Sequence, residues 1–72
     1  MQILDLHGVQ HRFVDESTRR FFNFVSLPCE VITGNSPKMK KIVKNIVKQY
    51  GWFCYEKDSY NYGSLIVVEN KI

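Results

Sequence analysis

The stretch Glu30–Tyr50 (EVITGNSPKMKKIVKNIVKQY) constrains what this chain can fold into more than any other part of the sequence. It begins with an apolar strand at Val31 and Ile32, passes through a turn that contains glycine, and then carries two helix-start signals. Ser36 is a good N-cap because its hydroxyl can accept a hydrogen bond from an N–H that has no helical partner. Pro37 suits the first helical turn because its missing N–H costs nothing there. The apolar residues that follow recur at intervals of three and four, which predicts one buried face of an amphipathic helix: Met39, Ile42, Val43, Ile46, Val47 and Tyr50.

The opposite face of this predicted helix is basic. It carries five lysines and no acidic residue: Lys38, Lys40, Lys41, Lys44 and Lys48. These five lysines give the helix a charge of +5, whereas the net charge of the whole chain is +3, so the positive charge is concentrated on this helix. Such a patch is typical of surfaces that bind polyanions, and it is also the pattern of a solvated face that keeps a small protein soluble. The N–H groups at the start of the helix add a natural site for phosphate.

The composition indicates the class of protein. A chain of 72 residues predicts one domain, 1–72, with a small core, and 44% hydrophobic residues are enough to build that core. The sequence shows no apolar run of the ~20 residues that span a bilayer and no visible leader, which predicts a cytoplasmic location without a membrane partner. Cys29 and Cys54 make no metal motif. We expect two buried thiols, or a disulfide if their strands are neighbours.

The remaining elements surround the central strand and helix. Strands are predicted at Gln2–Leu6, Trp52–Lys57 and Ser64–Glu69, a further helix over roughly Gln10–Val25, and a C-cap for the second helix at Gly51. The buried face of the first helix is predicted to consist of Val14, Thr18, Phe21 and Val25, with Phe13 and Phe24 flanking it. The order is β-α-β-α-β-β, in which strands joined by a helix should be parallel and the last two should pair as a hairpin. We therefore predict an α/β fold, a two-layer sandwich with a mixed four-stranded sheet, and leave the strand order open.

Two turns of this fold should open on one edge of the sheet. The turn at His7-Gly8 and the turn at Gly34-Asn35-Ser36 both follow parallel strands, and ligands of open α/β sheets bind at the C-terminal ends of such strands. The residues expected to converge there are Asp5, His7, Thr33, Gly34, Ser36 and Lys38.

Asp5 and His7 lie two residues apart and therefore share a strand face. The carboxylate could hold the imidazole in one tautomer while the imidazole moves a proton to or from an RNA 2′-hydroxyl or the leaving oxygen. The helix N-terminus, Ser36 and Lys38 would then offset charge on the phosphate, without a metal or cofactor. The alternative is structural: Asp5 bonds N–H groups of the adjacent turn and His7 caps the first helix.

Four more residues can be placed near this edge. His11 could face it, although its position is that of an ordinary surface residue. Arg12 could reach a phosphate or remain solvated. Tyr60 and Tyr62 could stack on unpaired bases, or could simply cover a small core.

Three segments together resemble one family. Ile3–Gly8 (ILDLHG) resembles the LDLHG signature that opens the Smr (small MutS-related) domain, and Ile32–Ser36 (ITGNS) is similar to its second signature, TGxG or HGxG. Tyr62–Glu69 is similar to the Gly-rich turn and last strand of that domain, so the resemblance covers about Ile3 to Glu69. It implies a fold like the C-terminal domain of a bacterial translation initiation factor, nucleic-acid binding, and often endonuclease activity.

Carried over by position, Asp5 and His7 match the acid and histidine of the first signature and become the implied catalytic residues. Ser36 departs from the pattern, because the family has glycine there. The expected function is therefore nucleic-acid binding with endonuclease activity, for which RNA is preferred as the substrate and DNA is the alternative. The alternatives are a binding module without cleavage, which Ser36 favours, and a docking domain for an acidic protein partner. The expected phosphate- and nucleic-acid-binding residues are Gly8, Arg12, Thr33, Gly34, Asn35, Ser36, Lys38, Lys41, Tyr60 and Tyr62.

Overall fold

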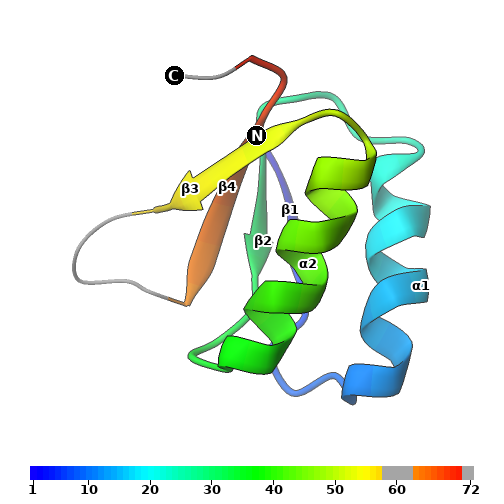
Figure 1. The fold of residues 1–72 in the computed structure, drawn as a ribbon, viewed down its shortest axis with the longest axis vertical. Coiled ribbons are helices and arrows are strands. Elements are labelled where there is room, and N and C mark those ends of the chain that lie inside the picture. Colours follow the sequence, from blue (N-terminus) through cyan, green and yellow to red (C-terminus); the bar gives the residue numbers. More distant parts are fainter. Residues whose placement is uncertain (58–62, 71–72) are drawn as a thin grey trace.

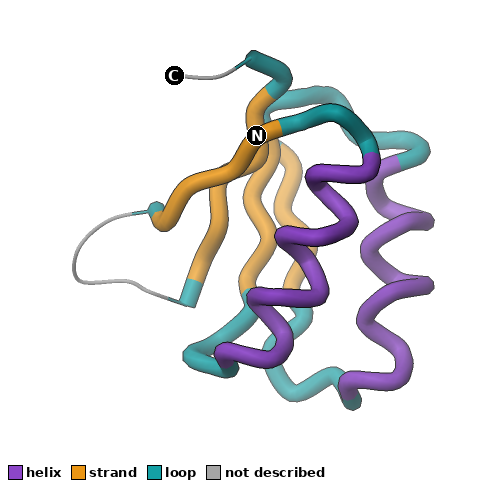
Figure 2. The backbone as a smooth tube through the Cα atoms, in the orientation of Figure 1, coloured by secondary structure: helices purple, strands orange, loops and turns teal. Residues whose placement is uncertain are grey.

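The computed structural model describes residues 1–57 and 63–70, and its elements follow the predicted order. They are β1 (Gln2–Asp5), α1 (His11–Phe22), β2 (Cys29–Ile32), α2 (Pro37–Gln49), β3 (Phe53–Glu56) and β4 (Ser64–Val68). The two helices lie side by side on one face of a mixed four-stranded sheet, which makes a small α/β fold of two layers (Figures 1 and 2). Within the described residues, neither helix has the length and apolar character that crossing a membrane requires.

The sheet has the strand order β1-β2-β4-β3. β1 is parallel to β2, and β4 is antiparallel to both β2 and β3, so the predicted parallel and hairpin pairings are confirmed. Because β4 lies between β2 and β3, Cys29 and Cys54 each pair in register with Val67 from opposite sides. Two strand spacings of about 4.8 Å separate them, too far for a disulfide, and both thiols are free.

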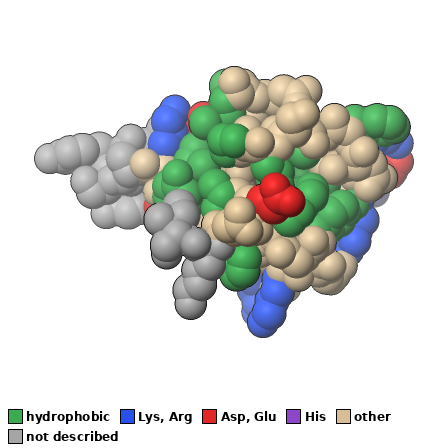
Figure 3. All heavy atoms as spheres, turned by 90° about the horizontal axis from the view of Figure 1, so that it is seen from above, with side chains coloured by type: hydrophobic (Ala, Val, Ile, Leu, Met, Phe, Trp, Pro, Cys, Tyr) green, Lys and Arg blue, Asp and Glu red, His purple; other side chains and the backbone are tan. Residues whose placement is uncertain are grey.

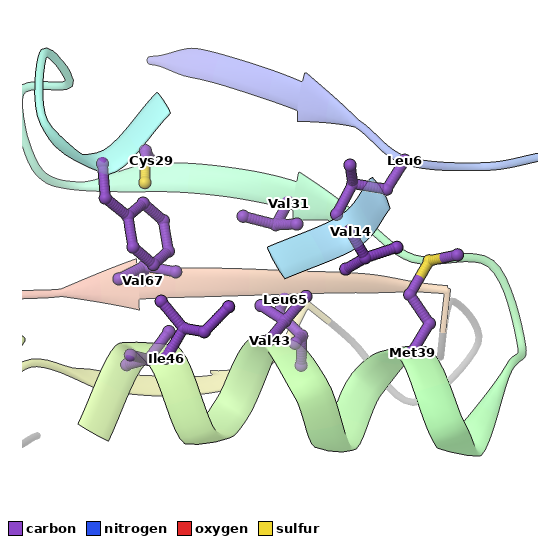
Figure 4. Close-up of a cluster of buried hydrophobic side chains, with 11 residues drawn as sticks. Leu6, Val14, Cys29, Val31, Met39, Val43, Ile46, Leu65 and Val67 are labelled. Carbon is purple, nitrogen blue, oxygen red and sulfur yellow. The ribbon is translucent and has the colours of Figure 1, made fainter. Parts of the chain in front are cut away.

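The core lies between the sheet and the two helices (Figure 4). The apolar stripe of α2 points into it as predicted, with Met39, Val43, Ile46 and Val47 buried. The strands contribute Cys29, Val31, Leu65 and Val67 from the opposite side. Burying an aliphatic side chain of this size contributes about 1.5–3 kcal/mol, so this stripe is the main contact that holds α2 on the sheet.

Both predicted ends of α2 are confirmed. The Ser36 hydroxyl accepts a hydrogen bond from Met39 N at 3.1 Å, and Pro37 opens the helix. At the other end Gly51 has a φ of +75°, a left-handed conformation that glycine adopts without strain. Gly51 N donates to Lys48 O at 3.0 Å and Trp52 N donates to Val47 O at 3.1 Å, the paired bonds of a Schellman motif.

The predicted end of α1 at Val25 is wrong by one turn. The helix ends at Phe22, because Phe24 N donates to Phe21 O in a tight last turn and the Asn23 side chain accepts the Tyr50 hydroxyl at 2.9 Å. This ending turns Phe22 into the core, where the predicted Phe21 is half-buried instead. Phe22, Tyr50 and Trp52 then form a cluster with ring centroids 4.9–5.4 Å apart.

The strands are shorter than predicted. β1 ends at Asp5, β3 lacks the predicted Trp52 and Lys57, and β4 ends at Val68. Leu6 N still donates to Ile32 O and Lys57 N still donates to Ser64 O, so the pairing continues one residue beyond β1 and β3, and Leu6 is buried.

Candidate functional site

The two predicted turns do meet at one end of the molecule, where both helices begin (Figure 1). Leu6 N donates to Ile32 O at 2.8 Å, which continues the pairing of β1 and β2 past the end of β1. Thr33 N and Gly34 N donate to Gly63 O at 2.8 and 3.1 Å. The turn after β2 is therefore tied to the start of β4, and it lies beside the turn after β1.

The His7 imidazole lies against the backbone of Gly34. Gly34 has a φ of +66°, and a Cβ built on it would stand 3.5 Å from His7 Cδ2. The left-handed backbone favours glycine at this position. His7 is exposed, and its ring has no hydrogen-bond partner among residues 1–57 and 63–70.

Asp5 follows the structural alternative that the sequence left open. Its Oδ1 accepts a hydrogen bond from His7 N at 2.9 Å, so the carboxylate holds the turn that carries the imidazole. The donor is the backbone N–H of His7, and the imidazole ring takes no part in this bond. Asp5 is therefore placed to position His7 through the backbone.

His11 is the site residue that the sequence analysis underrated. It is the first residue of α1, and its Nε2 lies 3.2 Å from Ser36 Oγ, the cap of α2. The bond joins the starts of the two helices, and His11 is half-buried there. A signal was present: helices that follow neighbouring parallel strands both begin at the same edge of the sheet.

The other predicted residues divide into two groups. Gly8 and Asn35 are exposed in the two turns, as expected of residues near a ligand. Thr33 is buried, and its hydroxyl donates to Gly34 O at 2.8 Å, so it stabilises the turn from inside. Arg12 is held along α1, where its Nε donates to Gln10 Oε1 and its guanidinium lies 4.8 Å from the Phe13 ring centroid. Tyr60 and Tyr62 lie outside the described residues.

The basic face of α2 is partly neutralised from another element. Glu56 Oε1 of β3 lies 3.4 Å from Lys40 Nζ and 3.9 Å from Lys44 Nζ. Lys38, Lys41 and Lys48 are exposed and form no ion pair with the described residues. Their spacing places them on one stripe with Asn45, about 15 Å long from end to end. We call Lys38, Lys41 and Lys48 the lysine stripe.

Together these groups form one site, which contains the imidazoles of His7 and His11, the Ser36 cap, and the start of the lysine stripe. The first turn of α2 has no acidic residue, so no carboxylate of that turn offsets the positive end of the helix dipole. Among the described residues, no three His, Cys, Asp or Glu side chains cluster in a way that could bind a metal ion.

No family model, curated protein or solved structure matches this chain. The site geometry is therefore what supports a function.

Proposed function

We propose that this protein is an Smr-like nucleic-acid-binding domain, similar in fold to the C-terminal domain of a bacterial translation initiation factor, that binds RNA and cleaves it. One observation carries the proposal: two imidazoles lie along the turn Gly34–Ser36, at the start of a helix with a basic exposed face. Positive charge that attracts a phosphate and groups that transfer protons thus lie side by side.

Binding begins at the N-terminus of α2. In the first turn of α2, the Met39 N–H donates to Ser36 Oγ, and Pro37 has no N–H. The Lys38 N–H is therefore the one that can donate to a phosphate oxygen. The lysine stripe continues from this point along the helix and neutralises the following phosphates.

Cleavage then needs a base and an acid. One imidazole in its neutral form takes the proton of the 2′-hydroxyl, and the 2′-oxygen attacks the adjacent phosphorus. The bond to the 5′-oxygen breaks, and the other imidazole in its protonated form gives this oxygen a proton. The products are a 2′,3′-cyclic phosphate and a 5′-hydroxyl, which is why the substrate is RNA. Asp5 contributes by holding the turn on which His7 is mounted.

A second candidate function is RNA binding without cleavage. The bond from His7 N to Asp5 Oδ1 favours it, because this carboxylate oxygen is engaged by the backbone rather than by the ring. Ser36 favours it as well, since a side chain at this position limits how closely a phosphate can approach the turn.

The test is a cleavage assay combined with a binding assay. Labelled single-stranded RNA, structured RNA and plasmid DNA are incubated with the native chain and with His7→Ala, His11→Ala and Asp5→Ala, with and without EDTA. Asn45→Ala is the matched control, because Asn45 is exposed on α2 and carries no charge. RNA cleavage that survives EDTA, requires both histidines and leaves a cyclic phosphate supports the mechanism.

The other outcomes separate the alternatives. Salt-sensitive RNA binding without cleavage by the native chain identifies the binding module. Cleavage that EDTA abolishes removes the two-histidine mechanism and leaves an endonuclease that uses a metal. Absence of binding to any polynucleotide at low salt refutes both functions and leaves an acidic protein as the partner to test.

A further inference from the structure

The side of α1 that faces away from α2 carries a second apolar stripe. On the α2 side, Arg19 Nη2 donates to Gln49 Oε1 at 2.7 Å and Asn23 receives the Tyr50 hydroxyl. On the other side, Phe13, Ser17 and Phe21 follow one another at intervals of four residues, and Phe24 comes directly after the end of the helix. We call these four residues the outer stripe of α1.

The outer stripe is exposed to an unusual degree for aromatic side chains. Phe13 is 47% exposed and Phe24 is 85% exposed, and hydrophobic side chains are also visible on the surface at the end of the molecule where α1 terminates (Figure 3). Ser17, Phe21 and Phe24 of the stripe line an open pocket of about 350 Å³, and the rest of its lining is Gln2 and Leu4 of β1, Arg20 and Val25. Exposed aromatic side chains gathered around such an opening make this face a candidate interaction site.

The neighbouring strand is also unprotected. β1 is an edge of the described sheet, and its pairing with β2 uses the backbone groups of Leu4 and Leu6. Those of Ile3 and Asp5 therefore point outward. The strand contains neither the lysine nor the proline that commonly shields an edge. A partner seated on the pocket would cover this edge as well.

We infer that the outer stripe is the interface of a two-fold symmetric homodimer in which two α1 helices cross antiparallel at Ser17. The spacing of the stripe is self-complementary: Phe13 and Phe21 lie four residues on either side of Ser17. The two-fold axis brings Phe13 of one copy against Phe21 of the other, next to the pocket beside β1. The small Ser17 side chain allows the two helices to approach closely at the crossing.

Charge also favours a second copy as the occupant. Glu16 and Arg20 flank the outer stripe and pair with each other, so the patch is neutral. An antiparallel crossing brings Glu16 of one copy close to Arg20 of the other, and the attraction is made twice. The lysine stripe would repel another copy, and it lies on α2, on the far side of α1 (Figure 1).

The exposed apolar area indicates which size class of interface the dimer would have. An aromatic side chain can bury about 150–250 Å², so the exposed parts of Phe13 and Phe24 amount to on the order of 250 Å² per copy. About 500 Å² of phenylalanine surface in the pair is well below the roughly 1,200 Å² of a standard stable interface. The dimer should therefore be weak and reversible, and should form only at high protein concentration.

Sedimentation velocity of the intact chain over a wide concentration range tests the inference. The native chain should shift from the 8.5 kDa of one copy toward twice that mass as its concentration rises. Phe24→Glu should keep the chain at 8.5 kDa without affecting folding, because the side chain is exposed. Phe53→Glu is the matched control: Phe53 is 43% exposed on β3 at the opposite edge of the sheet, and this variant should still dimerise.

Charge exchange supplies an independent check. Glu16→Arg should weaken the dimer by repulsion, and adding Arg20→Glu should restore it. The inference is overturned if the native chain stays at 8.5 kDa up to millimolar concentration. It is also overturned if Phe53→Glu abolishes the dimer while Phe24→Glu leaves it intact, because the interface would then lie on β3.

Discussion

The lysine stripe leads to a quantitative prediction about salt. Each lysine that neutralises a phosphate of single-stranded RNA lowers the slope of log K against log salt concentration by about 0.7. Lys38, Lys41 and Lys48 form no ion pair with the described residues, so together they should contribute a slope of about −2. Lys41→Gln should reduce the steepness by about 0.7, which corresponds to roughly fivefold weaker binding at about 0.1 M salt relative to a 1 M reference.

Lys44→Gln is the matched control on the same helix. Lys44 Nζ lies 3.9 Å from Glu56 Oε1, so its charge is already partly neutralised and its removal should change the slope much less. Glu56→Gln should have the opposite effect and steepen the slope, because it removes the carboxylate charge beside the exposed Lys44 ammonium group.

Fluorescence anisotropy with a labelled single-stranded RNA, titrated at a series of KCl concentrations, measures these slopes. Circular dichroism of each variant shows that the fold is retained. Equal slopes for Lys41→Gln and the native chain would refute the placement of RNA along the stripe. A loss at Lys44 as large as that at Lys41 would show that Glu56 does not shield its neighbours.

Three further predictions concern stability and can be measured by urea denaturation. Ser36→Ala removes the cap bond to Met39 N and should lower the free energy of unfolding by about 1 kcal/mol, whereas Ser36→Gly should cost a few tenths. Phe22→Ala should lower it by about 3 kcal/mol because the aromatic cluster loses its centre, whereas Phe24→Ala, at an exposed position, should change it by less than about 0.5 kcal/mol. Burial raises the pKa of the Cys29 thiol to about 11, so between pH 9 and 11 the thiol ionises in the unfolded chain before it does in the folded chain. The free energy of unfolding should therefore fall as the pH rises through this window, and it should fall less in Cys29→Ala; an equal decline would contradict the assignment.

Local patterns in the sequence determined most of the elements. The order of strands and helices, the buried stripe of α2 and both of its ends follow from periodicity and capping, which act within a few residues. The meeting of the turns after β1 and β2 also followed from the sequence, because parallel strands must end at the same edge.

The tertiary structure decided the features that depend on contacts between distant segments. The strand order places β4 between β2 and β3, which keeps Cys29 and Cys54 apart. The Tyr50 hydroxyl donates to Asn23, the residue that follows the last residue of α1. His11 at the start of α1 is bonded to Ser36, the N-cap of α2. Glu56 reaches Lys40 and Lys44 from β3. Each of these contacts joins residues that are distant in the chain, and such pairs have no local signal in the sequence because packing of the sheet and helices brings them together.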